Sequence, residues 1–471
     1  MGGFFGVASA GNAVRDLYFG TDYHSHLGTV RGGMAVKSGR RYTRFIHDIT
    51  NAQFRSKFDP DIRRMKGQWG IGIISDGDDQ PLLVESHLGP YAIVTVGAIQ
   101  NLKALVRNGF RNRSTHFLEM SGSRLNSTEV VATLINAGGT FAEGIRQAQE
   151  AIVGSCSLLL LTQEGVYAAR DRFGRTPVAL GQRKDPAGWA AASEVSAFPN
   201  LEYVPVRELG PGEIVRFTHD GVETLRPPDE ALQICAFLWI YYGYPSSTYE
   251  GVNVEEARYR CGEALARNDG AEVDLVAGIP DSGTSHAIGY ALQSHIPLKR
   301  PFVKYTPTWP RSFMPPDQGI RQMVARMKLI PIPELIAGQR ILFCEDSIVR
   351  GTQLGAIVRR VFKYGAREVH MRPACPPLVY GCKFLNFSRS RSETELAARR
   401  AMKAIEGKDS RHPERYLDPA SNAYADMVGH ICRDLELTSL KYQRIEDMVQ
   451  AIGLPKRKLC TYCWDGCEGC K

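Results

Sequence analysis

The stretch CEDSIVRGT at residues 344–352 places two adjacent acids before a short loop of Ser, Arg, Gly and Thr. An apolar run precedes it and a helix-forming run follows, so the loop should join a strand to a helix. Backbone N–H groups at such a helix start bind anions. Glu345 and Asp346 would repel a bare phosphate, so we expect them to contact sugar hydroxyls or a Mg²⁺ ion brought by a phosphorylated ligand. An N-cap cluster at a surface turn is the simpler alternative.

A second loop of the same kind lies upstream, in VDLVAGIPDSGTSHAIGYAL. Asp281, Ser282 and Gly283 stand there between an apolar strand and a helix. Two anion-binding loops at neighbouring strand ends suit a ligand with two phosphate-bearing arms. With the acid pair, they predict a site for 5-phosphoribosyl pyrophosphate (PRPP), and no Walker A sequence offers another phosphate site.

The chain changes pattern near its middle. The first ~225 residues contain short strands separated by turns, as in SCSLLLLTQEGVYAARDRFG and PGEIVRFTHDGVETL. From about residue 250, strands alternate with helices, which predicts βαβ units and a parallel sheet. Residues 383–425 are polar and basic, and we expect an exposed helix and a long loop there.

Length and composition set the broad class. A chain of 471 residues predicts two large domains, and its net charge of +8 is mild. It suits a binder of anionic small molecules, although it is more often a feature of an ordinary solvated surface. We expect a cytoplasmic protein that binds neither nucleic acid nor membrane, because no long apolar run or leader-like start appears.

The cysteines concentrate at the chain's end. With eleven cysteines and no leader expected, a disulfide framework is not predicted. The tail LCTYCWDGCEGCK holds Cys460, Cys463, Cys467 and Cys470, and paired C-x-x-C spacing indicates a metal or cluster site.

Several blocks resemble the glutamine PRPP amidotransferase family, which begins purine biosynthesis. They are GGFFGVAS, GIPDSG, CEDSIVRGT and GAREVHMRPACPP. The resemblance implies a two-domain protein of α/β and α+β class. Residues 1–229 would form an αββα sandwich of the N-terminal-nucleophile hydrolase type, a class II glutamine amidotransferase-like domain. Residues 230–471 would form a type I phosphoribosyltransferase domain with a parallel sheet and a cysteine-rich tail.

The resemblance also implies the site residues of the second domain. Mg²⁺ would be bound at Ser282, Glu345 and Asp346. The residues implied in PRPP binding are Asp281, Ser282, Gly283, Lys304, Arg311, Lys328, Glu345, Asp346, Ser347, Ile348, Val349, Arg350, Gly351 and Thr352. Of these, Lys304, Arg311 and Lys328 belong to a loop region that closes over pyrophosphate. Glu345 departs from the family, which has Asp at this position.

The iron–sulfur subtype of the family is the best match. Its four-iron four-sulfur (4Fe-4S) ligands fall at Cys235, Cys382, Cys460 and Cys463. Cys467 and Cys470 are extra to that pattern, and together with the first tail pair they could instead form a zinc site.

The first domain departs from the family at the residues that hydrolyse glutamine. Gly2 stands where the family has its nucleophilic Cys, so no sulfur can attack the amide. Ser75 replaces the Arg that binds the glutamine carboxylate, and Ser127 replaces the Asp that binds its ammonium group. Val96 replaces the oxyanion-hole Asn, although Gly97 remains, and Leu27 interrupts a His-Arg-Gly turn. We therefore expect this domain to lack glutaminase activity and to contain no catalytic residue.

Two functions follow from the sequence. One is an amidophosphoribosyltransferase-like enzyme that joins PRPP to ammonia or another amine, releases pyrophosphate and does not use glutamine itself. The other is a non-catalytic PRPP or nucleotide sensor. In either case we expect Mg²⁺, a 4Fe-4S cluster, a nucleotide effector and a homo-oligomer, either a dimer or a tetramer.

Overall fold

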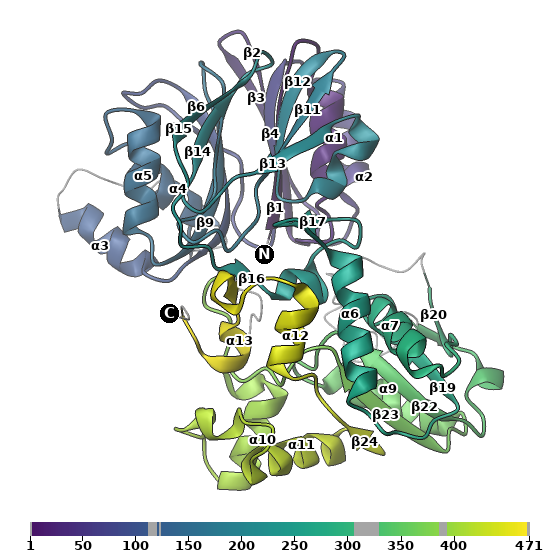
Figure 1. Cartoon of the computed structure of the whole chain (residues 1–471). Coiled ribbons are helices and arrows are strands. Elements are labelled where there is room, and N and C mark those ends of the chain that lie inside the picture. The colour runs from purple at the N-terminus through teal and green to yellow at the C-terminus, as the bar shows by residue number, and fades with distance from the viewer. Residues whose placement is uncertain (1, 112–119, 122–123, 306–328, 386–392, 469–471) are drawn as a thin grey trace.

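The structure is a computed structural model that describes residues 2–111, 120–121, 124–305, 329–385 and 393–468. Figure 1 shows two stacked layers of strands in the first half of the chain and a separate smaller sheet in the second half. The last segment of the chain lies between these two parts.

A seven-stranded sheet carries the N-terminus on one of its central strands. Its strands, in spatial order, are β13 (Val204–Glu208), β11 (Ala179–Lys184), β12 (Ala187–Ala192), β1 (Gly2–Ser9), β4 (Trp69–Ser75), β2 (Arg31–Ser38) and β3 (Arg41–Asp48). Helices α1 (Val14–Asp22) and α2 (Phe54–Ile62) cover its outer face, where Phe5, Leu17 and Phe54 pack in one buried cluster.

A six-stranded sheet packs against the inner face of the first. It contains β15 (Val222–Arg226), β14 (Ile214–Phe217), β10 (Val166–Ala169), β9 (Gly154–Leu161), β6 (Tyr91–Ile99) and β5 (Leu82–Val84). Phe4 and Ile71 from one sheet meet Val94 and Leu159 from the other in the core between them. Helices α4 (Ser127–Ile135) and α5 (Phe141–Ala151) cover the outer face. The predicted αββα sandwich is confirmed.

The second half contains the predicted parallel sheet. Its strands are β19 (Leu275–Gly278), β22 (Arg340–Glu345), β23 (Glu368–Pro373) and β24 (Ser439–Leu440), and each pairs in parallel with the next. Helices α6 (Val254–Arg267) and α7 (Thr284–Ser294) pack on one face, and α9 (Thr352–Lys363) packs on the other. Asn253 caps α6 by accepting a hydrogen bond from the Glu256 N–H at 3.1 Å.

The basic segment after residue 383 differs from the prediction. It forms α10 (Ala397–Glu406) as expected, but α10 is amphipathic and buries Ala401 and Met402 against the same core as α9. A further helix, α11 (Asn422–Asp434), packs beside it. The segment is therefore part of the parallel-sheet half and not an exposed appendage.

The tail returns to the boundary between the two halves. Strand β25 (Leu459–Cys460) pairs in parallel with β16 (Ile234–Cys235), directly after the last strand of the sandwich. Helices α12 (Ile445–Ile452) and α13 (Tyr462–Asp465) flank it, and Figure 1 shows this yellow segment between the upper and lower parts.

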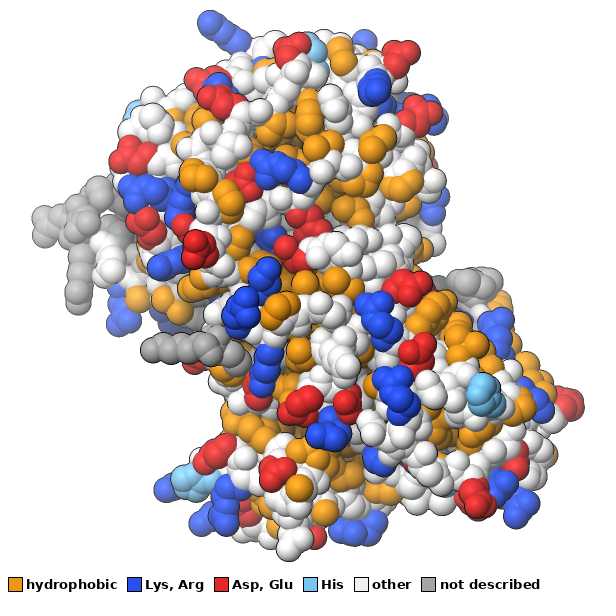
Figure 2. All heavy atoms as spheres, in the orientation of Figure 1, with side chains coloured by type: hydrophobic (Ala, Val, Ile, Leu, Met, Phe, Trp, Pro, Cys, Tyr) orange, Lys and Arg blue, Asp and Glu red, His pale blue; other side chains and the backbone are white. Residues whose placement is uncertain are grey.

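The surface matches the mild net charge. On the face shown in Figure 2, basic and acidic side chains alternate without a large field of one sign. None of the helices in the described ranges has both the length and the apolar character needed to cross a bilayer.

Candidate functional site

The two predicted loops lie side by side at the carboxyl ends of neighbouring strands. β19 and β22 pair in parallel up to Gly278 and Cys344, so the residues that follow them emerge at one edge. The Ile279 N–H donates to the Cys344 carbonyl at 3.0 Å, which extends this pairing into the first loop. A Cβ atom on Gly283 would lie 2.3 Å from the Cys344 oxygen, so only glycine allows this close approach.

The acid pair and the first loop are in direct contact. The Ser282 hydroxyl donates to Glu345 Oε1 at 3.2 Å, and the Asp346 N–H donates to the same oxygen at 3.1 Å. The Ser347 hydroxyl donates to Asp346 Oδ1 at 2.5 Å. Burial, followed by the neighbouring Asp346 carboxylate, raises the pKa of Glu345 well above its usual value. Two carboxylates and a hydroxyl in this arrangement form the hard oxygen set that Mg²⁺ prefers.

The second loop leads into α9 and is held by contacts with the start of α10 and the residues before it. Gly351 adopts φ +73°, a left-handed conformation that favours glycine, immediately before the helix begins at Thr352. The Val349 carbonyl accepts from the Ala397 N–H at 2.8 Å. The Arg350 side chain binds Glu395 at 2.8 Å, so it points toward the α10 region. What remains for an anion is the backbone of the turn, the start of the helix and the exposed Thr352 side chain.

One predicted residue of the closing loop lies in the described part of the chain. Lys304 ends β20 (Phe302–Lys304), which pairs with β21 (Leu329–Pro331), and its ammonium group forms an ion pair with Asp281. Both side chains are about half exposed or more, so this pair is open to exchange with a ligand. Arg311 and Lys328 lie outside the described residues.

Arg258 on α6 is a buried cation that interacts electrostatically with Asp346 and was not predicted from the sequence. Its side chain is 4% exposed, and its guanidinium donates to the carbonyls of Trp239, Tyr241 and Gly243 at 2.8–3.0 Å. Burial lowers the pKa of Arg258, whereas the negative charge of Asp346 opposes this shift. The signal was available, because Arg258 interrupts the apolar face formed by Val254, Ala257 and Cys261.

The residues expected to replace the glutaminase machinery also lie together. Gly2 pairs with Ser75 across β1 and β4, and a Cβ on Gly2 would lie 2.5 Å from the Ile74 carbonyl oxygen. At Gly3, an added Cβ would meet Leu27 at 2.6 Å and His24 at 2.8 Å. These two side chains are buried, and burial lowers the pKa of His24 to about 4.

The other replaced positions have acquired unrelated contacts. Val96 is 5% exposed in the core between the sheets. The backbone N–H of Ser127 donates to Asp78 at 2.8 Å, and its hydroxyl binds the same carboxylate. The described part of this pocket therefore offers apolar or neutral side chains at positions where glutamine binding needs opposite charges.

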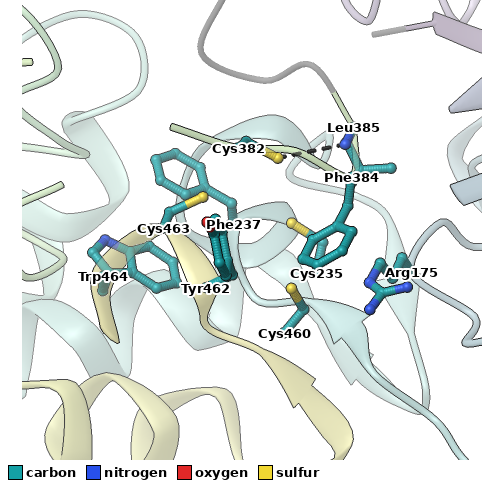
Figure 3. Close-up of a pocket in the computed structure, with 10 residues that line it drawn as sticks. All are labelled: Arg175, Cys235, Phe237, Cys382, Phe384, Leu385, Cys460, Tyr462, Cys463 and Trp464. Atoms are coloured by element: carbon teal, nitrogen blue, oxygen red, sulfur yellow. Dashed lines mark hydrogen bonds between the residues drawn. The ribbon is translucent and has the colours of Figure 1, made fainter. Parts of the chain in front are cut away.

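Four cysteines from three segments line a single cavity at the boundary between the halves (Figure 3). They are Cys235 in β16, Cys460 in β25, Cys463 in α13 and Cys382 in the loop after β23. Phe237, Phe384, Tyr462 and Trp464 form much of the remaining wall. The space between these groups is about 10 Å³, roughly the room of one water molecule.

The thiols influence one another. A hydrogen bond with Cys382, followed by burial, raises the pKa of Cys463 well above its usual value. Burial and the Cys460 and Cys382 thiols do the same for Cys235. Within the described ranges, no three His, Cys, Asp or Glu side chains converge as they would around a single metal ion. Cys467 lies outside the cavity lining, and Cys470 is outside the described residues.

Comparisons with known proteins agree with this architecture. A model of the glutamine amidotransferase domain matches residues 67–200. The chain is 31% identical to amidophosphoribosyltransferase of Mycobacterium tuberculosis, covering 98% of this chain and 85% of that protein. It is 28% identical to the Methanocaldococcus jannaschii protein of the same name, with 99% and 97% coverage.

A solved structure is similar over the same extent. Glutamine PRPP amidotransferase from B. subtilis, complexed with ADP and GMP, is 26% identical with a TM-score of 0.82 and covers 98% of this chain and 96% of its own. Both halves and the order in which they occur are thus accounted for by relatives of nearly full length, and the chain belongs to the amidophosphoribosyltransferase family.

Proposed function

We propose that the chain transfers the 5-phosphoribosyl group of PRPP to ammonia or another amine, releases pyrophosphate and has no glutaminase activity of its own. The family relationship supports transfer to an amine as the reaction class. The proposal that the chain transfers the phosphoribosyl group but does not hydrolyse glutamine rests on a contrast between two sites. Ser282, Glu345 and Asp346 are in hydrogen-bond contact, whereas Gly2 offers no nucleophile and has no room for a Cβ.

The reaction requires C1 of the ribose to lose pyrophosphate while positive charge develops on the ring. Asp346 would face the ribose, where its charge stabilises that centre in a site closed to water. The turn from Ser347 to Gly351 and the Thr352 hydroxyl would hold the 5′-phosphate. Asp281, Ser282 and Gly283 would bind the pyrophosphate, joined by Lys304 when it leaves its ion pair with Asp281. A bound Mg²⁺ would neutralise the leaving pyrophosphate, with Ser282, Glu345 and Asp346 as its nearby oxygen donors.

The amine must come from elsewhere under this proposal. Ser75 pairs with Gly2, His24 and Leu27 are buried beside Gly3, and Val96 lies in the core between the sheets. None supplies a thiol, a carboxylate clamp or an oxyanion donor of the kind that glutamine hydrolysis uses. Ammonia from solution or from a separate glutaminase would then be the nucleophile. We also propose that residues 1–229 are retained as a folded unit for contacts rather than for catalysis.

The cysteine cavity supports a 4Fe-4S cluster as a structural cofactor. Four thiols are the donor set that such clusters use, and most of the side chains around them are apolar. Because a four-iron cluster is larger than one ion, its thiolates stand further apart than those of a zinc site. The small volume means that the surrounding side chains would move outward on assembly. The thiols would lose their protons on binding and tie the tail to Cys235 and Cys382.

Two further expectations rest on the family alone. The B. subtilis relative carries ADP and GMP, and we propose that this chain also responds to a nucleotide. We propose a homo-oligomer, dimer or tetramer, which sedimentation of the anaerobic protein would determine.

Pyrophosphate release decides between an enzyme and a sensor. Anaerobically purified protein is mixed with Mg²⁺ and PRPP, with and without ammonium, while PRPP affinity is measured in parallel. The proposal predicts saturable binding and ammonium-dependent release of pyrophosphate. Binding of PRPP without any release would instead support a non-catalytic sensor, and no binding would remove the PRPP site altogether.

A further inference from the structure

Arg175 belongs to the sandwich half of the chain but lines the cysteine cavity at the boundary. It follows β10 in the turn DRFGRT, and its side chain is 3% exposed. In Figure 3 its guanidinium lies beside Phe384, on the side of the cavity where Cys460 lies. Its backbone is also engaged, because the Arg175 carbonyl accepts from the Cys235 N–H at 3.2 Å.

The guanidinium is held in a fixed orientation. Its two terminal nitrogens donate to the Gly154 carbonyl at 3.2 Å and to Gln233 Oε1 at 3.0 Å. The ring of Phe384 lies 3.8 Å from its central carbon, and the ring of Phe173 lies at 4.7 Å. A stacked, doubly hydrogen-bonded guanidinium has little freedom to swing toward solvent.

This buried cation has no matching anion in the described part of the chain. Among the described residues Arg175 forms no ion pair with Asp or Glu, its buried Nε–H donates to no oxygen or nitrogen, and its guanidinium favours the charged form of the Cys460 thiol. An unpaired buried charge and an unpaired buried donor are both costly. The other lining groups are cysteine sulfurs, aromatic rings and Leu385, and the sulfurs are the groups that become negative when they bind a metal.

We propose that Arg175 is the counter-cation of the cysteine site and donates its Nε–H to sulfur there, stabilising the more negative, reduced state of the cluster. The inference rests on the proposed 4Fe-4S cofactor. Net charge and hydrogen bonds to sulfur are the two local quantities that set the potential of such a cluster. Since Arg175 lies in the sandwich half, a residue of that half would raise the reduction potential of a cluster bound by cysteines of the other half.

The test uses the whole chain, purified anaerobically, as the wild type and as four variants. Arg175→Met removes the charge with little change in length, Arg175→Gln keeps an N–H donor without the charge, and Arg175→Lys keeps the charge without the planar fork. Arg172→Met is the matched control, because Arg172 is exposed and also stacks on Phe173, at 5.4 Å. Iron content and circular dichroism are recorded first, and the one-electron midpoint is then measured by titration with dithionite. The cluster accepts one electron from dithionite in this couple, and no bond is made or broken.

The expected results are graded. Arg175→Met should shift the oxidised-to-reduced equilibrium at least tenfold toward the oxidised state, which is about 59 mV lower for one electron. Arg175→Lys should stay within about threefold of the wild type, Arg175→Gln should fall between these two, and Arg172→Met should be unchanged. If Arg175→Met fails to fold or to retain iron, the comparison of Gln with Lys decides.

The failures are distinguishable. A wild-type protein without iron overturns both the cluster and the role of Arg175. A wild type with about four irons per chain, whose potential is the same in all Arg175 variants, overturns the role of Arg175 alone.

Discussion

The two candidate sites of this chain contain different kinds of side chains. At the parallel sheet, charged and hydroxyl groups lie in a half-open edge and contact one another across two loops. At the first strand of the sandwich, the corresponding space is occupied by Leu27, neutral His24 and a close backbone contact at Gly2. Buried polar side chains cost free energy, so under the proposed loss of glutaminase activity apolar packing can replace them without loss of the fold.

The largest effect should come from removing the charge of Asp346. Asp346→Asn keeps the shape, and we expect about a 100-fold loss of ammonium-dependent turnover with a smaller change in PRPP affinity. Steady-state kinetics and equilibrium binding measure the two quantities separately. Asp78→Asn removes a carboxylate from the other region and should leave turnover unchanged. A similar loss of turnover in Asp346→Asn and Asp78→Asn would contradict the proposed contrast between the two regions.

The next effect is a loss of stability when a side chain is added at Gly2. Gly2→Cys should destabilise the protein by about 1–3 kcal/mol, because the new Cβ meets the Ile74 oxygen at 2.5 Å. It should also release no glutamate from glutamine, since the other groups are still missing. Denaturant unfolding of the sandwich half measures the first result. Gly221→Ala is the control, because a Cβ there has nothing within 4 Å. Glutaminase activity in Gly2→Cys would show that the pocket is intact.

A smaller effect is expected at Thr352. Thr352→Val removes a hydroxyl from the proposed 5′-phosphate site and should weaken PRPP binding by roughly 1–2 kcal/mol. Turnover at saturation should change little, because the phosphate contact is equal in the ground and transition states. Isothermal titration gives the affinity, and the turnover number is the internal control. An unchanged affinity would place the phosphate elsewhere.

The smallest effect is a change in the pH dependence of stability at Glu208, near the boundary between the halves. Glu208 accepts a hydrogen bond from the Glu250 N–H at 2.8 Å, and burial raises the pKa of Glu208 to about 7. Because the folded pKa exceeds the unfolded value, stability is highest below about pH 4.5 for this group and falls as pH rises through 7. Glu208→Gln should flatten this trend, by about 1–3 °C in Tm between pH 5 and 8. Glu230→Gln, at an exposed site, should retain the wild-type slope; a wild-type slope in Glu208→Gln would contradict this role of Glu208.

The parts of the molecule that depend on local pattern could be predicted from the sequence. The strand, loop and helix around Glu345 and Asp346 follow one another within about 20 residues, and parallel pairing brings the Ser282 loop to the same edge. The hairpins of the sandwich carried their own turn signals. Helix α11 was missed because it begins at Asn422, inside the segment interpreted as a long loop, and because Asp426, His430 and Arg433 are mixed with its apolar residues.

The contacts at the boundary between the halves could not be predicted from local sequence pattern. The family resemblance predicted that Cys235, Cys382, Cys460 and Cys463 belong together, but no local pattern predicted that Arg175 joins them in one cavity. No periodicity in the turn DRFGRT indicates that its second arginine is buried and stacked on aromatic rings. Such contacts depend on tertiary packing, which a single sequence does not encode in any local window.

The most direct test of the central contrast is a paired assay on the wild-type protein. Glutamate and pyrophosphate are quantified after incubation with Mg²⁺ and PRPP, once with ammonium and once with glutamine at equal nitrogen. We predict pyrophosphate release with ammonium, and with glutamine no glutamate and no pyrophosphate above the control without an amine. Glutamate formed in proportion to the amount of enzyme would contradict the account, because it would require a working nucleophile in a pocket where the structure places Gly2.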